Sequence, residues 1–378
     1  MTETRIARRI VVTGADGFIG RNLALRLTEL GEDVLPLTRG STSDDWHAAV
    51  GRADAVVHLA GANRPVDPAD FDTINAGTAT LLVAALEAAA SEAGGRPIPV
   101  LYASSTRASG DDDYGRSKRA GEDALRDHGA RSGSPVYIFR LPNVFGKWAR
   151  PNYNSAVATF CHNIARDLPI AINDPAAPLS LVYIDDVVAA FVAVLDDRPA
   201  PGFAEVAPVY TTTVGMVADT IRGFRADRVD NLIDAVGTGL TRALYATYVA
   251  ALPPGEFSYA ITSHRDPRGA FSEMLKTRSA GQFSYFTALP GVTRGGHYHH
   301  TKTEKFLIVH GRARFGFRHM LTGETHEILT DGDTPTIVET VPGWAHDVTN
   351  VGDDVMVSLL WANEIFDRAR PDTITAKV

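Results

Sequence analysis

Short apolar runs alternate with longer helical stretches over roughly the first 250 residues. The apolar runs lie at 6–12, 34–37, 55–59, 98–103 and 136–141. The stretches with helical spacing lie at 18–30, 73–90 and 116–127. Short buried strands that alternate with helices are typical of a parallel sheet. This part of the chain therefore predicts an α/β Rossmann-like domain with helices on both faces of its sheet.

The pattern changes after about residue 250. A PPG sequence at 253–255 precedes short β-rich segments that Gly, Asp and Asn turns separate: FSYFTAL, EKFLIVHG, ARFGFRHM, TPTIVETV and VMVSLLW. Such segments predict an all-β sandwich or barrel. Helical segments near 214–224 and 241–251 are interpreted as the end of the first domain and a connector. We therefore expect two domains, 1–250 and 251–378, with a boundary set to within about ten residues.

Length and composition agree with two globular domains. The chain has 378 residues, and single cores stop growing near roughly 250–300. No apolar run approaches the roughly 18 residues of a membrane span, and Met1–Arg9 is not followed by the apolar segment of a signal peptide. The single cysteine, Cys161, excludes an internal disulfide framework. We therefore expect a cytoplasmic protein without a membrane partner.

The net charge of -8 gives no electrostatic footprint for nucleic acid, so no nucleic-acid partner is expected. An anionic substrate remains compatible with it, because local cations and helix N-termini can bind phosphate against an acidic background.

A glycine-rich turn follows the first strand. Gly14, Gly17 and Gly20 form G-x-x-G-x-x-G in the sequence TGADGFIG, where a helix begins. Glycines there let the backbone approach a pyrophosphate, and the helix N-terminus stabilises its charge. Nineteen residues past Gly20, Arg39 stands near the place where NAD-binding proteins have an acidic residue, which favours NADPH. The alternatives are a turn without a ligand and a solvated surface arginine.

A tyrosine and a lysine lie one helical turn apart at Tyr114 and Lys118. An ammonium beside the phenol would favour phenolate and lower the pKa of the tyrosine, which could then exchange a proton with a sugar oxygen. Ser104 and Ser105 end the preceding strand, where a hydroxyl could bind the same carbonyl. A lone Y-x-x-x-K is common by chance, but this one follows TGADGFIG, HLAG and YASS in order.

Residues 6 to about 245 resemble an extended short-chain dehydrogenase/reductase of the sugar-nucleotide branch. The resemblance implies that Ser105, Tyr114 and Lys118 carry out hydride-transfer chemistry at a sugar C4. NAG at 75–77 and RLPNVFG at 140–146 match family stretches near cofactor and substrate. The expected cofactor contacts are Thr13, Gly14, Gly17, Phe18, Ile19, Gly20, Arg39, Leu59, Ala60, Gly61, Tyr114, Lys118, Leu141 and Asn143.

One departure from that family narrows the reaction. Only eight residues separate Ser105 from Tyr114, and Thr106-Arg107 stands where 4,6-dehydratases have an Asp-Glu pair. Removal of water across C5 and C6 needs an acid at that point. Dehydration is therefore disfavoured, and simple reduction is favoured.

The segment GKWARPNYNS at 146–155 is dense in side chains that can bind a sugar or a nucleotide diphosphate. Its alternative interpretation is an irregular surface loop. Cys161 and His162 on the helix that follows are assigned no role. The expected substrate contacts are Ser104, Asn143, Arg150, Asn152 and Asn154.

The β-rich part carries a histidine pattern. The spacing Gly291-x5-His297-x-His299-x4-Glu304-x6-Gly311 is followed by Pro342-Gly343-x2-His346-x3-Asn350. Histidines two apart on a strand share a face, and a carboxylate with a third histidine can complete a site for Zn, Ni, Mn or Fe(II). The two segments reproduce the first cupin motif and approximate the second, so a cupin jelly-roll barrel is predicted. Many cupins use these positions without a metal.

The metal candidates are His297, His299, Glu304 and His346, and His300 is expected to be exposed or to face the substrate. D-x-R-G-x-F-x-E at 266–273 and GGHY at 295–298 resemble cupin-type sugar 3,5-epimerases. In those enzymes a histidine removes a proton next to a 4-keto group. His297 therefore has two candidate roles, metal ligand and catalytic base.

Over nearly the whole chain, LPNVFGKWARPNYNS, LVYIDDVV and RGGHYHHTKTEKFLIV resemble one family of bifunctional capsular-polysaccharide enzymes that act on UDP-2-acetamido-2,6-dideoxy-L-arabino-hexos-4-ulose. The resemblance implies C3 epimerisation in the cupin domain, then C4 reduction with NADPH. The product would be UDP-2-acetamido-2,6-dideoxy-L-talose, a precursor of UDP-N-acetyl-L-fucosamine. It also implies a zinc ion and a homodimer or tetramer.

Three other interpretations remain. The cupin could serve only for dimerisation or ligand sensing beside a plain NADPH-dependent 4-ketosugar reductase. The first domain could be an NAD-dependent 4-epimerase, against which Arg39 argues. A cupin dioxygenase fused to a reductase would consume oxygen and require Fe(II).

Overall fold

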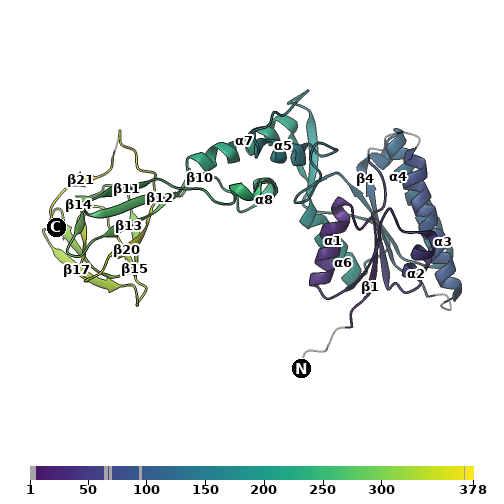
Figure 1. The fold of residues 1–378 in the computed structure, drawn as a ribbon, viewed down its shortest axis with the longest axis horizontal. Coiled ribbons are helices and arrows are strands. Elements are labelled where there is room, and N and C mark those ends of the chain that lie inside the picture. The colour runs from purple at the N-terminus through teal and green to yellow at the C-terminus, as the bar shows by residue number, and fades with distance from the viewer. Residues whose placement is uncertain (1–5, 64–66, 68–69, 93–95, 370) are drawn as a thin grey trace. The chain divides into compact units, whose positions relative to one another are not determined.

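The computed structural model describes residues 6–63, 67, 70–92, 96–369 and 371–378. The chain forms two compact units, coloured purple to teal and green to yellow in Figure 1. The first contains Met1–Ile221 and Arg242–Leu252, and the second contains Arg222–Thr241 and Pro253–Val378. The chain therefore passes between the units more than once.

The first unit is built on a six-stranded parallel sheet with the order β2-β1-β3-β4-β5-β8. Its strands are β1 (Arg9–Thr13), β2 (Asp33–Leu37), β3 (Ala55–His58), β4 (Val100–Ser105), β5 (Val136–Leu141) and β8 (Gly202–Ala204). The connecting helices are α1 (Phe18–Glu29), α2 (Ser43–Val50), η1 (Asp72–Ala76), α3 (Gly77–Glu92), η2 (Thr106–Ser109), α4 (Asp113–Ser132) and α6 (Ile184–Asp197). In Figure 1, α1 and α6 cover one face of the sheet, and α2, α3 and α4 cover the other. This is the predicted Rossmann-like arrangement.

A smaller sheet and three helices complete the region after β5. The sheet has the order β6-β7-β9. Its strands are β6 (Asn143–Phe145), β7 (Pro178–Tyr183) and β9 (Tyr210–Thr213), and the helices are α5 (Ala156–Ile164), α7 (Val214–Val229) and α8 (Gly239–Ala250). Cys161 is buried on α5.

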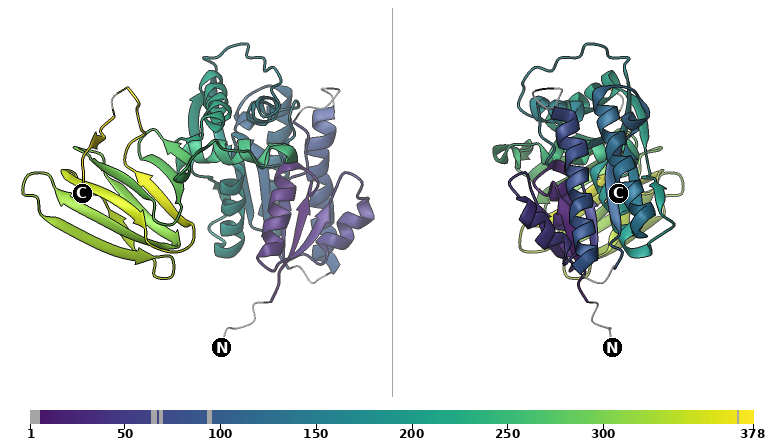
Figure 2. Two further views of the ribbon diagram at one scale, coloured as in Figure 1. Left: turned by 60° about the vertical axis from the view of Figure 1, so that its left-hand side comes forward. Right: turned by 90° about the vertical axis from the view of Figure 1, so that its right-hand side faces the viewer.

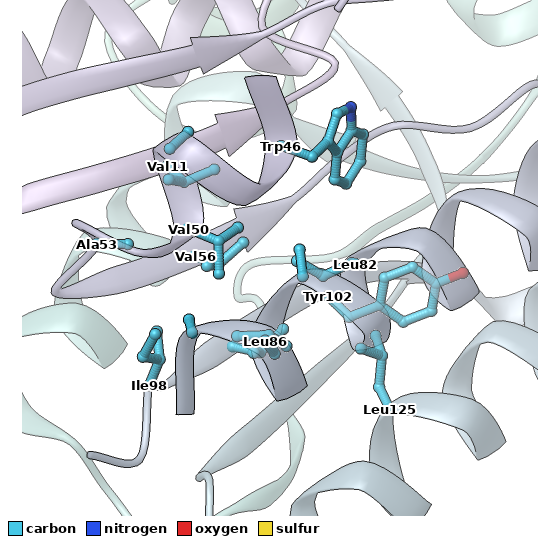
Figure 3. Close-up of a cluster of buried hydrophobic side chains, with 14 of the residues drawn as sticks. Val11, Trp46, Val50, Ala53, Val56, Leu82, Leu86, Ile98, Tyr102 and Leu125 are labelled. Atoms are coloured by element: carbon cyan, nitrogen blue, oxygen red, sulfur yellow. The ribbon is translucent and has the colours of Figure 1, made fainter. Parts of the chain in front are cut away.

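The core of the first unit lies where α2, α3 and α4 meet the sheet. Val11, Val56 and Tyr102 from the strands pack against Leu82 and Leu125 from the helices (Figure 3). Strands buried on both faces carry continuous apolar runs, which explains why these strands are visible in the sequence. The helices α3 and α4 lie side by side over this face (Figure 2).

One described segment, Asp72–Ser91, is long and apolar enough to cross a membrane. Its Leu82, Ala85, Leu86 and Ala89 are buried in the core of the first unit. Core helices of folded domains have the same composition.

The second unit consists of two β-sheets around one apolar core. One sheet has the order β10-β12-β13-β20-β15-β18, with β11 beside β12, and the other has the order β17-β16-β19-β14-β21. Phe286, Phe306, Phe315 and Val348 belong to the core cluster. This confirms the predicted all-β cupin domain. Its elements are β10 (Leu232–Ile233), η3 (Pro254–Glu256), β11 (Ser263–Asp266), β12 (Gly269–Thr277), β13 (Gly281–Ala288), β14 (Thr293–Tyr298), β15 (Glu304–His310), β16 (Arg312–His319), β17 (Thr325–Asp331), β18 (Ile337–Glu339), β19 (Trp344–Asn350), β20 (Met356–Ala362) and β21 (Ile374–Thr375).

Residues 222–241 differ from the expected connector, because they belong to the second unit. Leu232 and Ile233 of β10 pair in parallel with β12. The two guanidinium nitrogens of Arg278 also bind the two oxygens of Asp227 at 2.9 and 2.6 Å. A strand pairing and a bidentate ion pair thus join this segment to the β-domain that begins near residue 253.

Candidate functional site

The glycine-rich turn brings the end of β1 close to the turn after β3. Gly14 has φ +63°, and a Cβ placed on it would lie 2.9 Å from the Ala60 nitrogen. A Cβ on Gly20 would lie 2.1 Å from the Gly14 carbonyl oxygen, so α1 can begin here only with glycine at that position. The N-cap residue of α1 is Gly17, which has no side chain to cap the helix. At this turn the backbone can come close to a pyrophosphate, and the first N–H groups of α1 are available to bind it.

The Thr13 side chain connects the turn after β1 to the turn after β3. Its hydroxyl oxygen accepts hydrogen bonds from the backbone nitrogens of Leu59 and Ala60, both at 3.0 Å. The same hydroxyl lies 2.8 Å from His58 Nδ1. Burial, with a smaller effect from Lys118, lowers the pKa of His58 to about 3, so its imidazole is neutral. The Thr13 side chain is fully buried and positions the predicted cofactor turn.

The other predicted cofactor residues border the same edge of the sheet. Arg39 follows β2, is exposed, and has no ion pair within the described part of the chain. Leu141 ends β5 and is buried, whereas Asn143 is exposed and donates from Nδ2 to the Ser180 carbonyl at 3.1 Å. Phe18 and Ile19 are half-buried in the first turn of α1.

Tyr114 lies in the first turn of α4, which Asp112 caps through the Gly115 nitrogen at 2.9 Å. The Tyr114 side chain hydrogen-bonds Ser105. Burial raises the pKa of Tyr114, while this hydrogen bond and the nearby Arg107 act in the opposite direction. The Arg107 guanidinium carbon lies 5.2 Å from the centre of the tyrosine ring.

Lys118 does not act on the phenol as the sequence suggested. Its Nζ donates to the Ala103 carbonyl at 2.6 Å and lies 4.4 Å from the centre of the Tyr102 ring. Burial lowers the pKa of Lys118 to about 7, against an opposing effect of Glu122. The expected lowering of the Tyr114 pKa by Lys118 is therefore wrong for this structure, because burial dominates and Arg107 is the neighbouring cation.

The two serines that end β4 have different partners. Ser105 is hydrogen-bonded to Tyr114, whereas the Ser104 hydroxyl donates to Glu122. Arg140 holds the same carboxylate at 3.0 and 2.6 Å. Alternate residues of a strand point to opposite faces, which explains the separation. The hydroxyl of Ser104, a predicted substrate contact, is thus bound to the buried Glu122 carboxylate, which is also paired with Arg140.

The loop after β6 contains the remaining predicted substrate residues. Arg150, Asn152 and Asn154 are all exposed in it. Trp148 is 48% exposed and has φ +68°, an unusual conformation for a bulky residue. Its carbonyl accepts a hydrogen bond from Arg21 of α1 at 3.2 Å, so the loop lies beside the first turns of that helix.

Four side chains of the second unit converge on one point. His297 and His346 are partners in the ladder of β14 and β19, His299 follows β14, and Glu304 begins β15. Their possible ligand atoms all lie within 4.8 Å of one another. Glu304 Oε2 is 3.3 Å from His299 Nε2 and 3.5 Å from His346 Nε2. We call these four residues the His/Glu cluster.

The His/Glu cluster has the donor groups that a divalent metal needs. Burial, followed by the neighbouring His346 and His299, lowers the pKa of His297 to about 4, so its imidazole is neutral. Burial acts to raise the pKa of Glu304, but the neighbouring side chains of His299, His346 and Lys302 hold it far below its usual range. His346 Nε2 is buried without a well-oriented hydrogen-bond partner in the described chain. Three imidazoles and one carboxylate are a donor set that fits zinc and its neighbours.

Comparisons with known proteins match a known family to each of the two units. Residues 10–206 match the NAD dependent epimerase/dehydratase family, and residues 264–374 match the polysaccharide biosynthesis C-terminal domain. A UDP-2-acetamido-2,6-beta-L-arabino-hexul-4-ose reductase from Pseudomonas aeruginosa is 55% identical over 98% of this chain and 99% of that protein. The chain belongs to this reductase family.

Solved structures share the fold of this chain. The capsular polysaccharide assembling protein CapF from Staphylococcus aureus is 38% identical, with a TM-score of 0.91 over 98% of this chain and 100% of that one. RMD from Pseudomonas aeruginosa, solved with NADPH, has a TM-score of 0.54 at 20% identity over 65% of this chain and 99% of that one. The second likeness shows the fold alone.

Two residues of this reductase-family chain that border the cluster were missed from the sequence. Lys302 is buried, and its Nζ lies 2.8 Å from Glu304 Oε1. The Asp372 carbonyl accepts a hydrogen bond from His299 Nδ1. Lys302 lies within the motif and could have been noticed as a lysine among ligands. No sequence pattern indicated Asp372, because it follows His299 by more than 70 residues. His300 is exposed, as expected.

Proposed function

We propose that this chain reduces the C4 ketone of a UDP-2-acetamido-2,6-dideoxy-L-hexos-4-ulose with NADPH in its first unit, after the second unit has inverted C3. The product would be UDP-2-acetamido-2,6-dideoxy-L-talose, a precursor of UDP-N-acetyl-L-fucosamine. The observation that carries the proposal is the 55% identity, over nearly the whole of both chains, to a reductase of a UDP-4-keto sugar. The match to a polysaccharide biosynthesis domain favours a role in making a capsule or a related glycan.

The protonation state of Tyr114 suits reduction. A ketone that receives a hydride also needs a proton on its oxygen, so the acid must carry that proton at neutral pH. Burial raises the pKa of Tyr114 and thereby keeps the phenol protonated. The Ser105 hydroxyl, which hydrogen-bonds this phenol, can bind the same substrate oxygen. Tyr114 would donate the proton, and Ser105 would orient the carbonyl.

The cofactor residues favour NADPH. The turn with Gly14, Gly17 and Gly20 would hold the pyrophosphate, and the exposed guanidinium of Arg39 would pair with the 2′-phosphate. Lys118 Nζ would lie 3.8 Å from a Cβ on Gly61, in the turn assigned to the cofactor. When bound, NADPH supplies the hydride.

The His/Glu cluster suits proton exchange next to a ketone. His297 is half-buried, whereas His299, Glu304 and His346 are buried, so His297 is the cluster residue most open to a sugar. Its neutral imidazole could take the C3 proton. All four residues could instead hold zinc, which would supply Lewis-acid polarisation of the 4-ketone. We further propose a cytoplasmic homodimer or tetramer, as the sequence resemblance implies.

The alternative is a reductase whose cupin serves only for dimerisation or ligand sensing. The two functions are separated by incubating the UDP-4-keto-L-sugar with NADPH in D2O and analysing the product by NMR and mass spectrometry. We expect deuterium at C3, inverted configuration, and one NADPH oxidised per product. H297A should lose the C3 inversion, whereas H300A, which removes an exposed histidine next to the cluster, should keep it.

A Tyr114→Phe variant provides the reciprocal control. It removes the phenolic proton donor and should abolish NADPH oxidation while C3 exchange continues. Reduction without C3 exchange in the wild type would leave a reductase with a structural β-domain. Exchange without reduction in the wild type would refute the assignment of the first unit.

A further inference from the structure

The C-terminal residues 372–378 are fastened to the strand that carries the His/Glu cluster. Thr375 and Ile374 of β21 pair with His297 and Tyr298 of β14. The Ala376 nitrogen donates to the Gly296 carbonyl at 3.0 Å. Arg318 of β16 binds the Lys377 carbonyl at 2.7 Å. The end of the chain therefore forms an edge strand beside a cluster histidine.

Asp372 begins this segment and holds the turn between β14 and β15. Its carboxylate accepts hydrogen bonds from three consecutive backbone nitrogens: His300 at 2.9 and 3.1 Å, Thr301 at 2.7 Å and Lys302 at 2.9 Å. The Thr301 hydroxyl donates to it at 3.1 Å. Successive backbone N–H groups that point to one place form an anion-binding concavity, and here the chain fills it with its own carboxylate. The turn so fixed joins His299 to Glu304.

The backbone of Asp372 acts on His299 directly. Its carbonyl can only accept, so His299 Nδ1 must carry the proton of this hydrogen bond. Nε2 is then the ring nitrogen left to bind a metal, and it lies 3.3 Å from Glu304 Oε2 inside the cluster. Metal-binding histidines are commonly oriented by such a contact on the other nitrogen.

We propose that Asp372 is a positioning residue for metal binding: it locks the turn at 300–302 and the tautomer of His299, so that the site is complete only when the C-terminal segment is in place. The inference rests on the proposed metal at the His/Glu cluster. It does not depend on which reaction the cluster carries out.

The test measures zinc affinity of the intact chain by competition with a chromophoric chelator, together with the visible spectrum after Co²⁺ substitution. D372N keeps the size of the side chain but presents an amide to the three N–H groups. We expect zinc affinity to fall about 10- to 100-fold and the Co²⁺ bands to change. D331N is the matched control. Asp331 also accepts two turn nitrogens, at 3.1 and 2.9 Å, but has no bond to a cluster residue within the described chain.

Thermal unfolding of the metal-free proteins separates positioning from general stability. D372N and D331N should both lose stability, but only D372N should lose zinc affinity. D372E, which keeps the charge, should recover part of the affinity and serves if D372N does not fold. Equal zinc affinity in D372N and wild type would overturn the proposal. A wild type that binds no zinc would overturn it too, while leaving the D2O experiment to decide the reaction.

Discussion

The lowered pKa of Lys118 leads to a prediction that can be tested without substrate. Its ammonium is buried, and its pKa falls from the ordinary 10.5 to about 7 in the folded protein. The unfolded chain therefore binds the proton more tightly than the folded chain between these two values. The resulting penalty on folding is complete below pH 7 and disappears as the pH rises toward 10.5. Stability should thus increase with pH in this window.

The magnitude follows from the shift. One group that is protonated only in the unfolded state contributes up to ~1.4 kcal/mol per pH unit, or about 2 kcal/mol between pH 7 and pH 9 after allowance for incomplete titration. Lys118→Met removes the titrating group and should remove this slope. Loss of the hydrogen bond to the Ala103 carbonyl at 2.6 Å adds a pH-independent cost, so the slope and not the absolute stability is the readout.

The neighbours of Lys118 do not titrate in the same window. The pKa of His58 is about 3, and burial raises the pKa of both Tyr102 and Tyr114 above the usual value. The assay is urea unfolding of the cofactor-free protein at pH 7, 8 and 9, in a background with Trp148, Trp344 and Trp361 replaced by Phe. The fluorescence then reports Trp46 alone, which is buried in the same core as Lys118's neighbour Tyr102. Lys147→Met removes a lysine that pairs with Asp185 nearer the surface and should keep the wild-type slope. Equal slopes in wild type and K118M would refute the reasoning.

Two further predictions concern reduction. Ser105→Ala removes the hydroxyl that hydrogen-bonds Tyr114 and should lower kcat by about 100-fold. Ser104→Ala loses a hydrogen bond to Glu122 and should lower Tm while kcat stays within a few-fold of the wild-type value. Steady-state NADPH oxidation and thermal unfolding measure the two effects, and the reverse pattern would exchange the roles of the two serines. Arg39→Ala should raise KM for NADPH about tenfold and leave KM for NADH unchanged, and an equal change for both cofactors would exclude recognition of the 2′-phosphate.

The features best predicted from the sequence were the glycine-rich turn and the strands buried on both faces. The turn at Gly14 and Gly20 was visible because a Cβ at either position would collide with backbone atoms. The strands β1, β3 and β4 were visible because both faces are buried. The short strands β6 and β9 were missed, because three or four residues give too little pattern to distinguish them from loops.

Side-chain direction was harder to predict than position. The spacing of Tyr114 and Lys118 placed both on one helix, but the lysine binds Ala103 and lies over Tyr102. Ser104 and Ser105 could be separated only by knowing which face of β4 meets α4. Asp372 reaches His299 through tertiary structure alone, and no local pattern could have indicated it.

Helix α7 begins in the first unit and ends in the second, and residues 242–252 return to the first unit before the β-domain proper starts. The chain thus has three junctions between units, after Ile221, Thr241 and Leu252. A gene cut at residue 250 would remove β10 and Asp227 from the β-domain and leave them attached to the wrong fragment. A recombination event that replaced one unit with that of a relative would therefore have to join the two sequences correctly at all three junctions. This requirement favours inheritance of the two units together.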